Sequence, residues 1–542
     1  MENSQKLVAG QISIRTIRQW YLPILGLLCI VILALSFRVY NLTDLPVFVD
    51  EAIYIRWAQI MRAEPTLRFL PLSDGKQPLF MWIVIPFLKL LSDPLFAGRL
   101  VSVFAGIGTL LGVFTFTYIL FASKRTSLIA ALIYAIAPYT VFFDRLALVD
   151  SLLSFFGIWT FIFSILSARY LRLDMAMFAG FALGGALLTK SPSLFFALLL
   201  PVSLLIVDWP KKKTSVIITI GKLFVLWLVT WGIGYGMQNI MRLGPGFSNL
   251  FSRNLDYVHP ITQPLVSPFD PLMPHTDRAI EWLLALGPWP LIILIVLALL
   301  VNIRRFPRRL LLLSAWGILP ILIQAEYAKV FTARYIYFSL PILIVLATSA
   351  FLVLEYPTKI KYLMRYKKLM VKLAPLVLTL YCLHATLVSF TLVNSPEAAP
   401  LPRSERSGYL EDWTAGGGIR ETAEILKDIH RDNPGIPIVV GTEGYFGTLP
   451  DGLQIYLEKM PNVTVIGIGI DLHIVPQSLL DSYAAGNKTF LVINSSRLKM
   501  QEPYEQFGLK TLYSYQKPMR PVDAEKYKEN GPFDTLYLFE LQ

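Results

Sequence analysis

Residues 21–51 of this 542-residue chain read YLPILGLLCIVILALSFRVYNLTDLPVFVDE. The first part, Tyr21 to Phe37, is an apolar run long enough to cross a bilayer as a helix. No small-residue cleavage site follows it, so we interpret it as an uncleaved first helix, at about 20–40, rather than a signal peptide. The second part ends on two adjacent carboxylates, Asp50 and Glu51. Carboxylates close to a membrane are costly unless they are paired, solvated or used, so both are candidate functional groups.

Similar apolar runs recur along the chain, which is 55% hydrophobic and only 16% charged. Soluble proteins are about a quarter charged, so this composition predicts a polytopic α-helical membrane protein. The formal charge is +12, and in a membrane protein such an excess usually belongs to cytoplasmic loops. We therefore expect membrane lipids rather than nucleic acid as a partner. Cys29 and Cys382 both lie inside apolar runs, so neither a disulfide nor a zinc-thiolate site is expected.

The basic residues predict the topology. Lys6, Arg15 and Arg18 place residues 1–19 in the cytoplasm, so the first helix runs outward. The next long span, 95–121, ends at Lys124 and Arg125 and therefore runs inward. Residues 41–94 then form a large first external loop. Within it we expect two juxtamembrane helices, at about 50–63 and 78–92, because the second is apolar but too short to cross.

Continued alternation gives about eleven spans in a membrane domain at 20–393, with nearly every basic cluster on the inside. The expected spans after the first two are 127–143, 150–168, 175–188, 194–207, 216–235, 282–301, 310–323, 335–354 and 373–393. A long polar, proline-rich loop at about 237–281 is expected outside.

The composition changes at Asn394, where polar residues, proline and glycine become frequent. Residues 394–542 predict a small α/β domain, and the odd number of spans places it outside the cytoplasm. The pattern indicates a helix at 418–430 and short buried strands at 436–441, 463–469, 490–494 and 535–541.

Two candidate groups lie in the first external loop. Asp50 is a candidate base that would deprotonate an acceptor hydroxyl, although an acidic residue also suits the first turn of a helix. Lys76 stands in the sequence Gly75-Lys76-Gln77-Pro78-Leu79, where the chain re-enters the interface. A fixed cation at this point could bind a phosphate, and interfacial snorkelling is the alternative.

Further polar groups are expected on the same side of the membrane. Arg145 and Asp150 lie in a short external turn, where Asp150 could also be a helix cap. Lys190 lies at the external end of its span, and Arg334 with Tyr335 begins a later one. Both cations oppose the positive-inside rule, and they converge on the side that holds the carboxylates.

These motifs together resemble the GT-C glycosyltransferases that include protein O-mannosyltransferases and lipid A aminoarabinose transferases. The resemblance covers about residues 20–350 and is best in the first 200. It implies that Asp50 is the catalytic base, that Glu51 and Tyr335 support the site, and that Asp150 is a second catalytic carboxylate. It also implies that the donor phosphate contacts four cations, namely Lys76, Arg145, Lys190 and Arg334.

The chain departs from the family pattern in a few places. Gln77 replaces the proline that usually follows the lysine. Some aminoarabinose-type members hold a metal beside a glutamate at the position of Gly75, so no metal ligands are assigned here. A divalent metal near Asp50 and Asp150 stays an open expectation. The β-trefoil domain of the mannosyltransferases is not expected, and the C-terminal domain resembles those of uncharacterised bacterial members.

The expected function is an inverting transfer of a sugar from a polyprenyl-phosphate donor to a hydroxyl of a protein, lipid or glycan. The expected location is the bacterial inner membrane, with the active site and the C-terminal domain facing outside. The alternative is a membrane transporter or a flippase for glycolipid intermediates, which would favour mid-membrane polar residues and repeated halves. A noncatalytic scaffold is a third reading, and the presence of Asp50 and Lys76 disfavours it. The sugar, the acceptor and the oligomeric state stay open.

Overall fold

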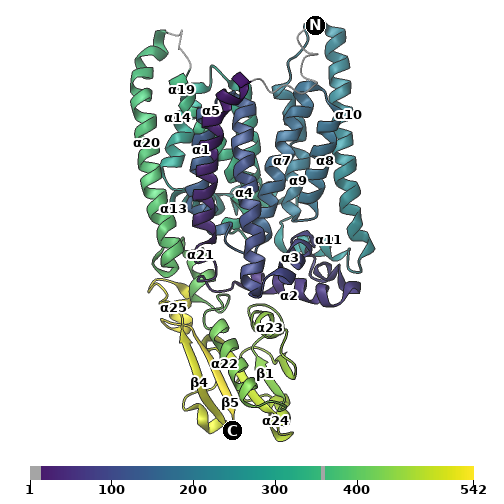
Figure 1. Cartoon of the computed structure of the whole chain (residues 1–542), viewed down its shortest axis with the longest axis vertical. Helices are drawn as coiled ribbons and strands as arrows, with labels where there is room; N and C mark the ends of the chain where they lie inside the picture. The colour runs from purple at the N-terminus through teal and green to yellow at the C-terminus, as the bar shows by residue number, and fades with distance from the viewer. Residues whose placement is uncertain (1–13, 356–360) are drawn as a thin grey trace.

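The computed structural model describes residues 14–355 and 361–542, and it shows an upright helix bundle above a small sheet domain (Figure 1). Within these residues, seven helical stretches are long and apolar enough to cross a membrane, or eight if one bent pair counts as a span. The seven are Gln19–Val39, Pro94–Phe121, Val149–Tyr170, Lys213–Leu243, Pro307–Tyr327, Ala333–Glu355 and Val371–Asn394. The expectation of a polytopic helical membrane protein is confirmed. Lys6 and Lys359 lie outside the described residues.

Shorter apolar helices complete the bundle. Helix α5 (Lys124–Ile136), helix α8 (Leu173–Leu187) and the broken segment Ser191–Ile206, which contains α9, occupy the places of three expected spans. Figure 1 shows α5, α8 and α9 upright among the longer helices. Prolines 138, 192 and 201 explain the breaks, because proline lacks the N–H that continues a helical ladder.

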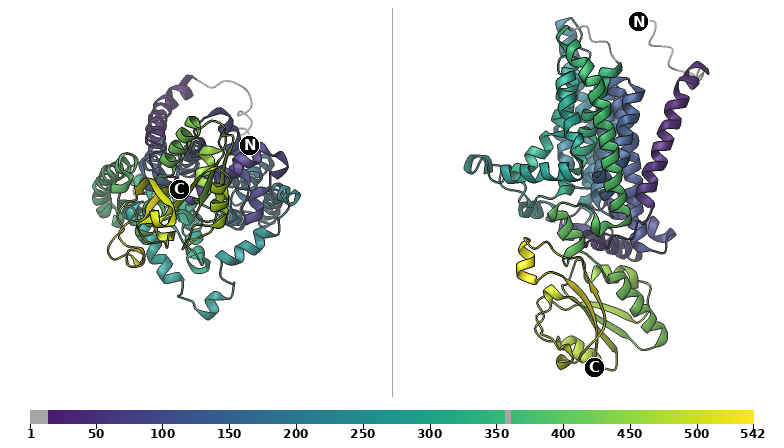
Figure 2. Two further views of the ribbon diagram at one scale, coloured as in Figure 1. Left: turned by 90° about the horizontal axis from the view of Figure 1, so that it is seen from below. Right: turned by 90° about the vertical axis from the view of Figure 1, so that its left-hand side faces the viewer.

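The expected span at 282–301 is not one continuous helix, because its first residues belong to a separate helix. Helix α13 (Leu272–Ala285) and helix α14 (Pro290–Asn302) are separate and meet at an angle of 104°. The intervening Gly287-Pro288-Trp289-Pro290 contains two prolines, which interrupt the helix. The expected external loop before it is also partly helical, and this segment projects sideways from the bundle (Figure 2).

The two expected juxtamembrane helices are present as α2 (Val49–Ala63) and α3 (Leu79–Leu90). They lie across the end of the bundle that faces the sheet domain (Figure 1). One face of α2 is fully buried, at Ala52, Ile55 and Ala58, so the helix is held between its neighbours. Its first turn, which carries Asp50, is thereby fixed at the junction of the two parts.

The C-terminal part follows helix α20 (Lys361–Asn394) and holds a five-stranded sheet in the order β2-β1-β3-β5-β4. Strands β1, β2 and β3 are parallel, and β5 is antiparallel to both β3 and β4. The bounds are β1 Ile438–Thr442, β2 Val463–Gly467, β3 Lys488–Asn494, β4 Leu509–Gln516 and β5 Thr535–Leu541.

Four of these strands and helix α22 (Ile419–Asp432) match the sequence expectations. Strand β4 was not predicted, because it is an edge strand whose side chains are mostly exposed.

The two parts are joined by backbone pairing. The Val49 N–H donates to the Thr414 carbonyl at 3.1 Å, and the Gly416 N–H donates to the Val47 carbonyl at 2.8 Å. Phe48 and Ala415 thus form an antiparallel bridge. The residues that lead into α2 are therefore paired with the C-terminal part just before Asp50.

Candidate active site

Asp50 lies in the first turn of α2 and contacts two cations. Lys76 Nζ donates to its Oδ1 at 3.3 Å, and Arg334 Nη1 donates to its Oδ2 at 2.5 Å. Burial alone would raise the pKa of this carboxyl, but the charges of Arg334 and Lys76 outweigh burial and hold it well below its usual range. Asp50 is therefore a carboxylate at every pH at which the protein would work.

Lys76 is positioned by a tight turn after the short helix Leu70–Asp74. Its ammonium lies 5.1 Å from the Tyr54 ring centroid and 5.7 Å from that of Trp57, both on α2. Gly75 has a φ of +65°, and a Cβ there would approach the Arg253 Cβ to 2.6 Å. Any side chain at residue 75 would therefore be strained in this structure.

A second ion pair lies close to the first. Lys190 Nζ donates to Asp150 Oδ1 at 2.6 Å and lies 4.6 Å from the Tyr335 ring centroid. Burial lowers the pKa of Lys190, while the adjacent Asp150 favours its charged form. Asp150 is only 2% exposed, and its Oδ2 has no hydrogen-bond partner among the residues that the structure describes. One buried acceptor atom is therefore left for a substrate.

The two ion pairs form one cluster, because Arg334 and Lys190 each lie within electrostatic reach of both carboxylates. The structure thus brings together five predicted residues from separate segments, with Tyr335 beside them: Asp50, Lys76, Asp150, Lys190 and Arg334. Lys76 also pairs with Asp74 at 3.4 Å, so three cations face three carboxylates, and several hydrogen-bond donors are fixed in one place. Such a site suits a phosphate.

Glu51 points the other way and is fully buried. Arg99 from helix α4 (Pro94–Phe121) donates two hydrogen bonds to its carboxylate, at 2.8 and 2.7 Å. The N–H groups of Phe48 and Ala147 donate to the same carboxylate at 3.0 and 2.6 Å. These contacts tie α2, α4 and the turn before α7 (Val149–Tyr170) together, so they fit the supporting role expected for Glu51.

Arg145 is not part of the cluster, contrary to the expectation that it contacts the donor phosphate. Its guanidinium donates to the carbonyls of Phe37, Arg38, Tyr40 and Asn41, at the end of helix α1 (Ile14–Val39). The C-terminal carbonyls of a helix attract a cation, and they occupy both terminal nitrogens of this arginine. Arg145 therefore stabilises the end of α1.

The sequence reasoning did not single out three buried charged residues near the site. Arg38 pairs with Asp144 at 3.0 Å, with both side chains inaccessible, and Arg99 holds Glu51. Both arginines adjoin or interrupt apolar runs, and an intramembrane charge is a signal that could have identified them. Glu405 accepts from the Ala333 N–H at 3.2 Å, next to Arg334, and burial raises its pKa. It lies in a polar stretch that gives no such signal.

The residues present do not fit a resident divalent metal. Within residues 14–355 and 361–542, no group of three or more His, Cys, Asp or Glu side chains could hold a metal ion. Both oxygens of Asp50 and one oxygen of Asp150 are already paired with cations. The expected metal near these carboxylates thus has no ligand set in this structure.

One protein-family model matches part of the chain. The family model of dolichyl-phosphate-mannose-protein mannosyltransferase matches residues 69–239, which include Lys76, Arg145, Asp150 and Lys190. No curated protein sequence matches the chain.

Solved structures match over nearly the whole chain. The apo crystal structure of ArnT from Cupriavidus metallidurans aligns with a TM-score of 0.54 and 14% identity, and the match covers 96% of this chain and 98% of that one. The crystal structure of the same protein bound to undecaprenyl phosphate aligns with a TM-score of 0.51 and 15% identity, over the same shares of the two chains. The chain is an integral membrane protein with the fold of the GT-C glycosyltransferases, the family that its motifs resemble.

Proposed function

We propose that this protein is an inverting glycosyltransferase that moves a sugar from a polyprenyl-phosphate donor to a hydroxyl acceptor. The observation that carries the proposal is the cluster of Lys76, Lys190 and Arg334 around Asp50 and Asp150. It combines fixed cations for a phosphate with a carboxylate that is held ionised. The undecaprenyl phosphate bound to the similarly folded ArnT supports this class of donor.

The donor phosphate would exchange partners within the cluster. Without a donor, Lys76 and Arg334 are both paired with Asp50. A phosphate that accepts hydrogen bonds from these two cations weakens their hold on the carboxylate. The pKa of Asp50 then rises toward its ordinary value, which makes it a better base. Donor binding thereby prepares the catalytic group.

The transfer needs no group besides the donor, the acceptor and the residues of the cluster. The acceptor oxygen forms a bond to the anomeric carbon on the face opposite the phosphate, and its proton passes to Asp50. The bond between the anomeric carbon and the phosphate oxygen breaks, and its electron pair leaves with the polyprenyl phosphate. Lys76, Lys190 and Arg334 stabilise the charge that develops on this leaving group. Configuration at the anomeric carbon inverts.

Asp150 has a positioning role in this scheme. Its Oδ1 holds Lys190 near the phosphate, and its unpartnered Oδ2 can accept a hydrogen bond from the acceptor. The cluster lies where the bundle meets the C-terminal part, and the basic loops lie mainly at the other end of the bundle. We therefore place the site and residues 394–542 on the outer face of a bacterial inner membrane.

A transfer assay in detergent tests the proposal against the alternative of a transporter or flippase. The purified protein is mixed with a polyprenyl-phosphate sugar and a cell-envelope extract as the source of acceptors. A glycosyltransferase forms a new glycosidic bond and releases polyprenyl phosphate without a second compartment. A transporter leaves the donor chemically unchanged, and that result would refute the proposal.

A further inference from the structure

A cavity lies in the C-terminal part, at the carboxyl ends of the parallel strands. Its place follows from the sheet topology, because the chain leaves β1 toward β2 on one side and leaves β3 toward β4 and β5 on the other. Ligands of open α/β sheets bind in the crevice at such a switch point. Glu443 directly follows β1, and Asn494 to Arg497 end and follow β3. Both segments are therefore at the position where a ligand is expected.

The cavity has a volume of about 290 Å³, and its lining holds more basic than acidic residues. Four cations line it, Arg497, Lys499, Arg520 and Lys526, against the two carboxylates Asp412 and Asp471. Both carboxylates are paired within the protein, since Arg520 and Lys526 donate to Asp412 and Lys499 Nζ lies 3.7 Å from Asp471 Oδ1. We name this cavity the Arg497 pocket.

Arg497 is held in a position suited to an anion. Its guanidinium carbon lies 3.8 Å from the Trp413 ring centroid, and its Nε lies 3.7 Å from Glu443 Oε1. Glu443 is fixed in turn by the N–H and the side-chain amide of Asn494, at 2.6 and 2.8 Å. No hydrogen-bond partner is found for Nη1 or Nη2 of Arg497 in the described part of the chain. A guanidinium stacked in this way can offer its outer edge to a carboxylate or phosphate.

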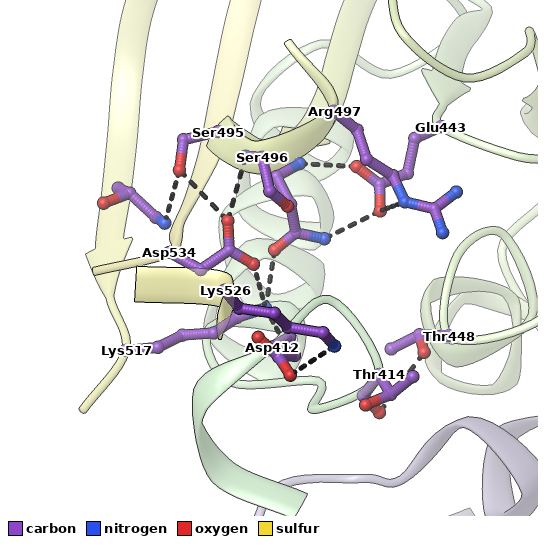
Figure 3. Close-up of polar contacts among 12 residues, drawn as sticks. Asp412, Thr414, Glu443, Thr448, Ser495, Ser496, Arg497, Lys517, Lys526 and Asp534 are labelled. Atoms are coloured by element: carbon purple, nitrogen blue, oxygen red, sulfur yellow. Dashed lines mark hydrogen bonds and ion pairs between the residues drawn. The ribbon is translucent and has the colours of Figure 1, made fainter. Parts of the chain in front are cut away.

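A polar network that includes Asp412 and Ser496 of the pocket lining lies beside the Arg497 pocket (Figure 3). Lys517, which is almost completely buried, donates to the Asp412 carbonyl at 2.9 Å, to Asn494 Oδ1 at 2.6 Å and to Asp534 Oδ2 at 3.2 Å. By contrast, the hydroxyl of Ser496, on the pocket wall, is buried and has no partner among the described residues. It leaves a second polar group free for a ligand.

The Arg497 pocket is linked to the active site through the backbone. Trp413 precedes Thr414, whose carbonyl accepts from the Val49 N–H, and Val49 precedes Asp50. This path holds the Cα atoms of Trp413 and Asp50 within roughly 15 Å of each other. One extended acceptor could reach both.

We propose that the Arg497 pocket binds an oxyanion, a phosphate or a carboxylate, carried on a sugar of the acceptor. Arg497 is the bidentate contact, and Lys499 and Ser496 complete the site. The assignment to the acceptor rests on the proposed function, whereas binding of the anionic sugar does not.

Calorimetric titration of the full-length protein in detergent tests this proposal. The probes are glucose 1-phosphate, glucuronate and neutral glucose, and excess undecaprenyl phosphate occupies the donor cluster. We expect at least one anionic probe to bind more than tenfold tighter than glucose, and the two probes distinguish phosphate from carboxylate recognition. Arg497→Gln should reduce this affinity at least tenfold, and Arg497→Lys should give an intermediate loss. Arg431→Gln, an exposed arginine on α22, is the matched control and should bind as wild type.

Equal binding of glucose and both anionic probes would overturn the proposal, as would wild-type binding by Arg497→Gln. The variant Asp50→Asn distinguishes a failure of the pocket proposal from a failure of the proposed function. If this variant loses transfer and keeps probe binding, both proposals stand. If it keeps transfer while Arg497→Gln loses probe binding, the pocket stands and the catalytic assignment fails. If no anionic probe binds while Asp50→Asn abolishes transfer, the pocket is wrong and the proposed function stands.

Discussion

Arg334 and Asp50 form a direct ion pair, with 2.5 Å between Nη1 and Oδ2, although 284 positions separate them in the chain. The pair joins the start of a late membrane helix to the first turn of α2. Lys76 pairs with the other oxygen of the same carboxylate, so Asp50 holds both cations when no donor is bound. A donor phosphate must therefore compete with this carboxylate for the same cations.

Replacement of Arg334 by glutamine should weaken donor binding. The change removes one charge-assisted hydrogen bond to the phosphate, worth about 1.5–3 kcal/mol, so the Kd for polyprenyl phosphate should rise at least tenfold. Calorimetry with undecaprenyl phosphate measures this directly. Arg172→Gln is the control, because Arg172 is an exposed arginine paired with Asp174 elsewhere. An unchanged Kd in Arg334→Gln would remove this residue from the donor site.

Asp150→Asn should make donor binding more sensitive to alkaline pH. Burial already lowers the pKa of Lys190, and Asp150 is its main opposing charge. Without that charge the pKa of Lys190 falls further, so the ammonium loses its proton, and the phosphate loses this contact, at a lower pH. The Kd for undecaprenyl phosphate, measured from pH 6 to 10, should begin to rise earlier in the variant than in wild type. Identical pH profiles would show that Lys190 does not contact the donor.

Glu51→Gln should act on stability rather than on chemistry. The variant cannot satisfy Arg99 and the two backbone N–H groups as a carboxylate does, and breaking a buried ion pair costs about 3–5 kcal/mol. Thermal unfolding in detergent should show a clearly lower midpoint, whereas Glu424→Gln, at an exposed pair, should not. A variant of wild-type stability that has lost transfer would contradict the supporting role of Glu51.

Asp451 should make stability depend on pH between about 4 and 6. Burial raises the pKa of Asp451 from 3.8 to about 6 in the folded protein. The folded state then binds more protons than the unfolded state in this interval, so the free energy of unfolding falls as the pH rises through it. The loss is on the order of 3 kcal/mol at most. Asp451→Asn should remove this part of the pH dependence and raise the unfolding midpoint at pH 7. A variant whose pH profile matches wild type would contradict the assignment.

Much of the site was predictable because charge near a membrane is conspicuous in a sequence. Asp50, Lys76, Asp150, Lys190 and Arg334 each interrupt or adjoin an apolar stretch, and the structure brings them together. Side-chain direction was not predictable in the same way. Arg145 also lies in a turn between two apolar stretches, yet its side chain donates to the carbonyls at the end of α1 and not to the cluster.

The fold shows the same division between strong and weak signals. The long apolar helices and four of the strands have clear apolar patterns, so they were predicted close to their observed bounds. The bend between α13 and α14 depends on two prolines inside an apolar run, and hydrophobicity alone does not report it. The bridge between Phe48 and Ala415 joins segments far apart in sequence, and no local pattern encodes it.

The central claim is that Asp50 is the base of a polyprenyl-phosphate sugar transfer, and Asp50→Asn tests it most directly. The measurement is the single-turnover rate of transfer from a saturating polyprenyl-phosphate sugar, with donor binding and thermal unfolding measured on the same sample. We expect the folded variant to bind the donor at least as tightly as wild type, since Asp50 no longer competes for Lys76 and Arg334. Its transfer rate should fall by about 10²–10⁴-fold, the usual contribution of a general base. Transfer at the wild-type rate by a folded, donor-bound Asp50→Asn protein would contradict the mechanism.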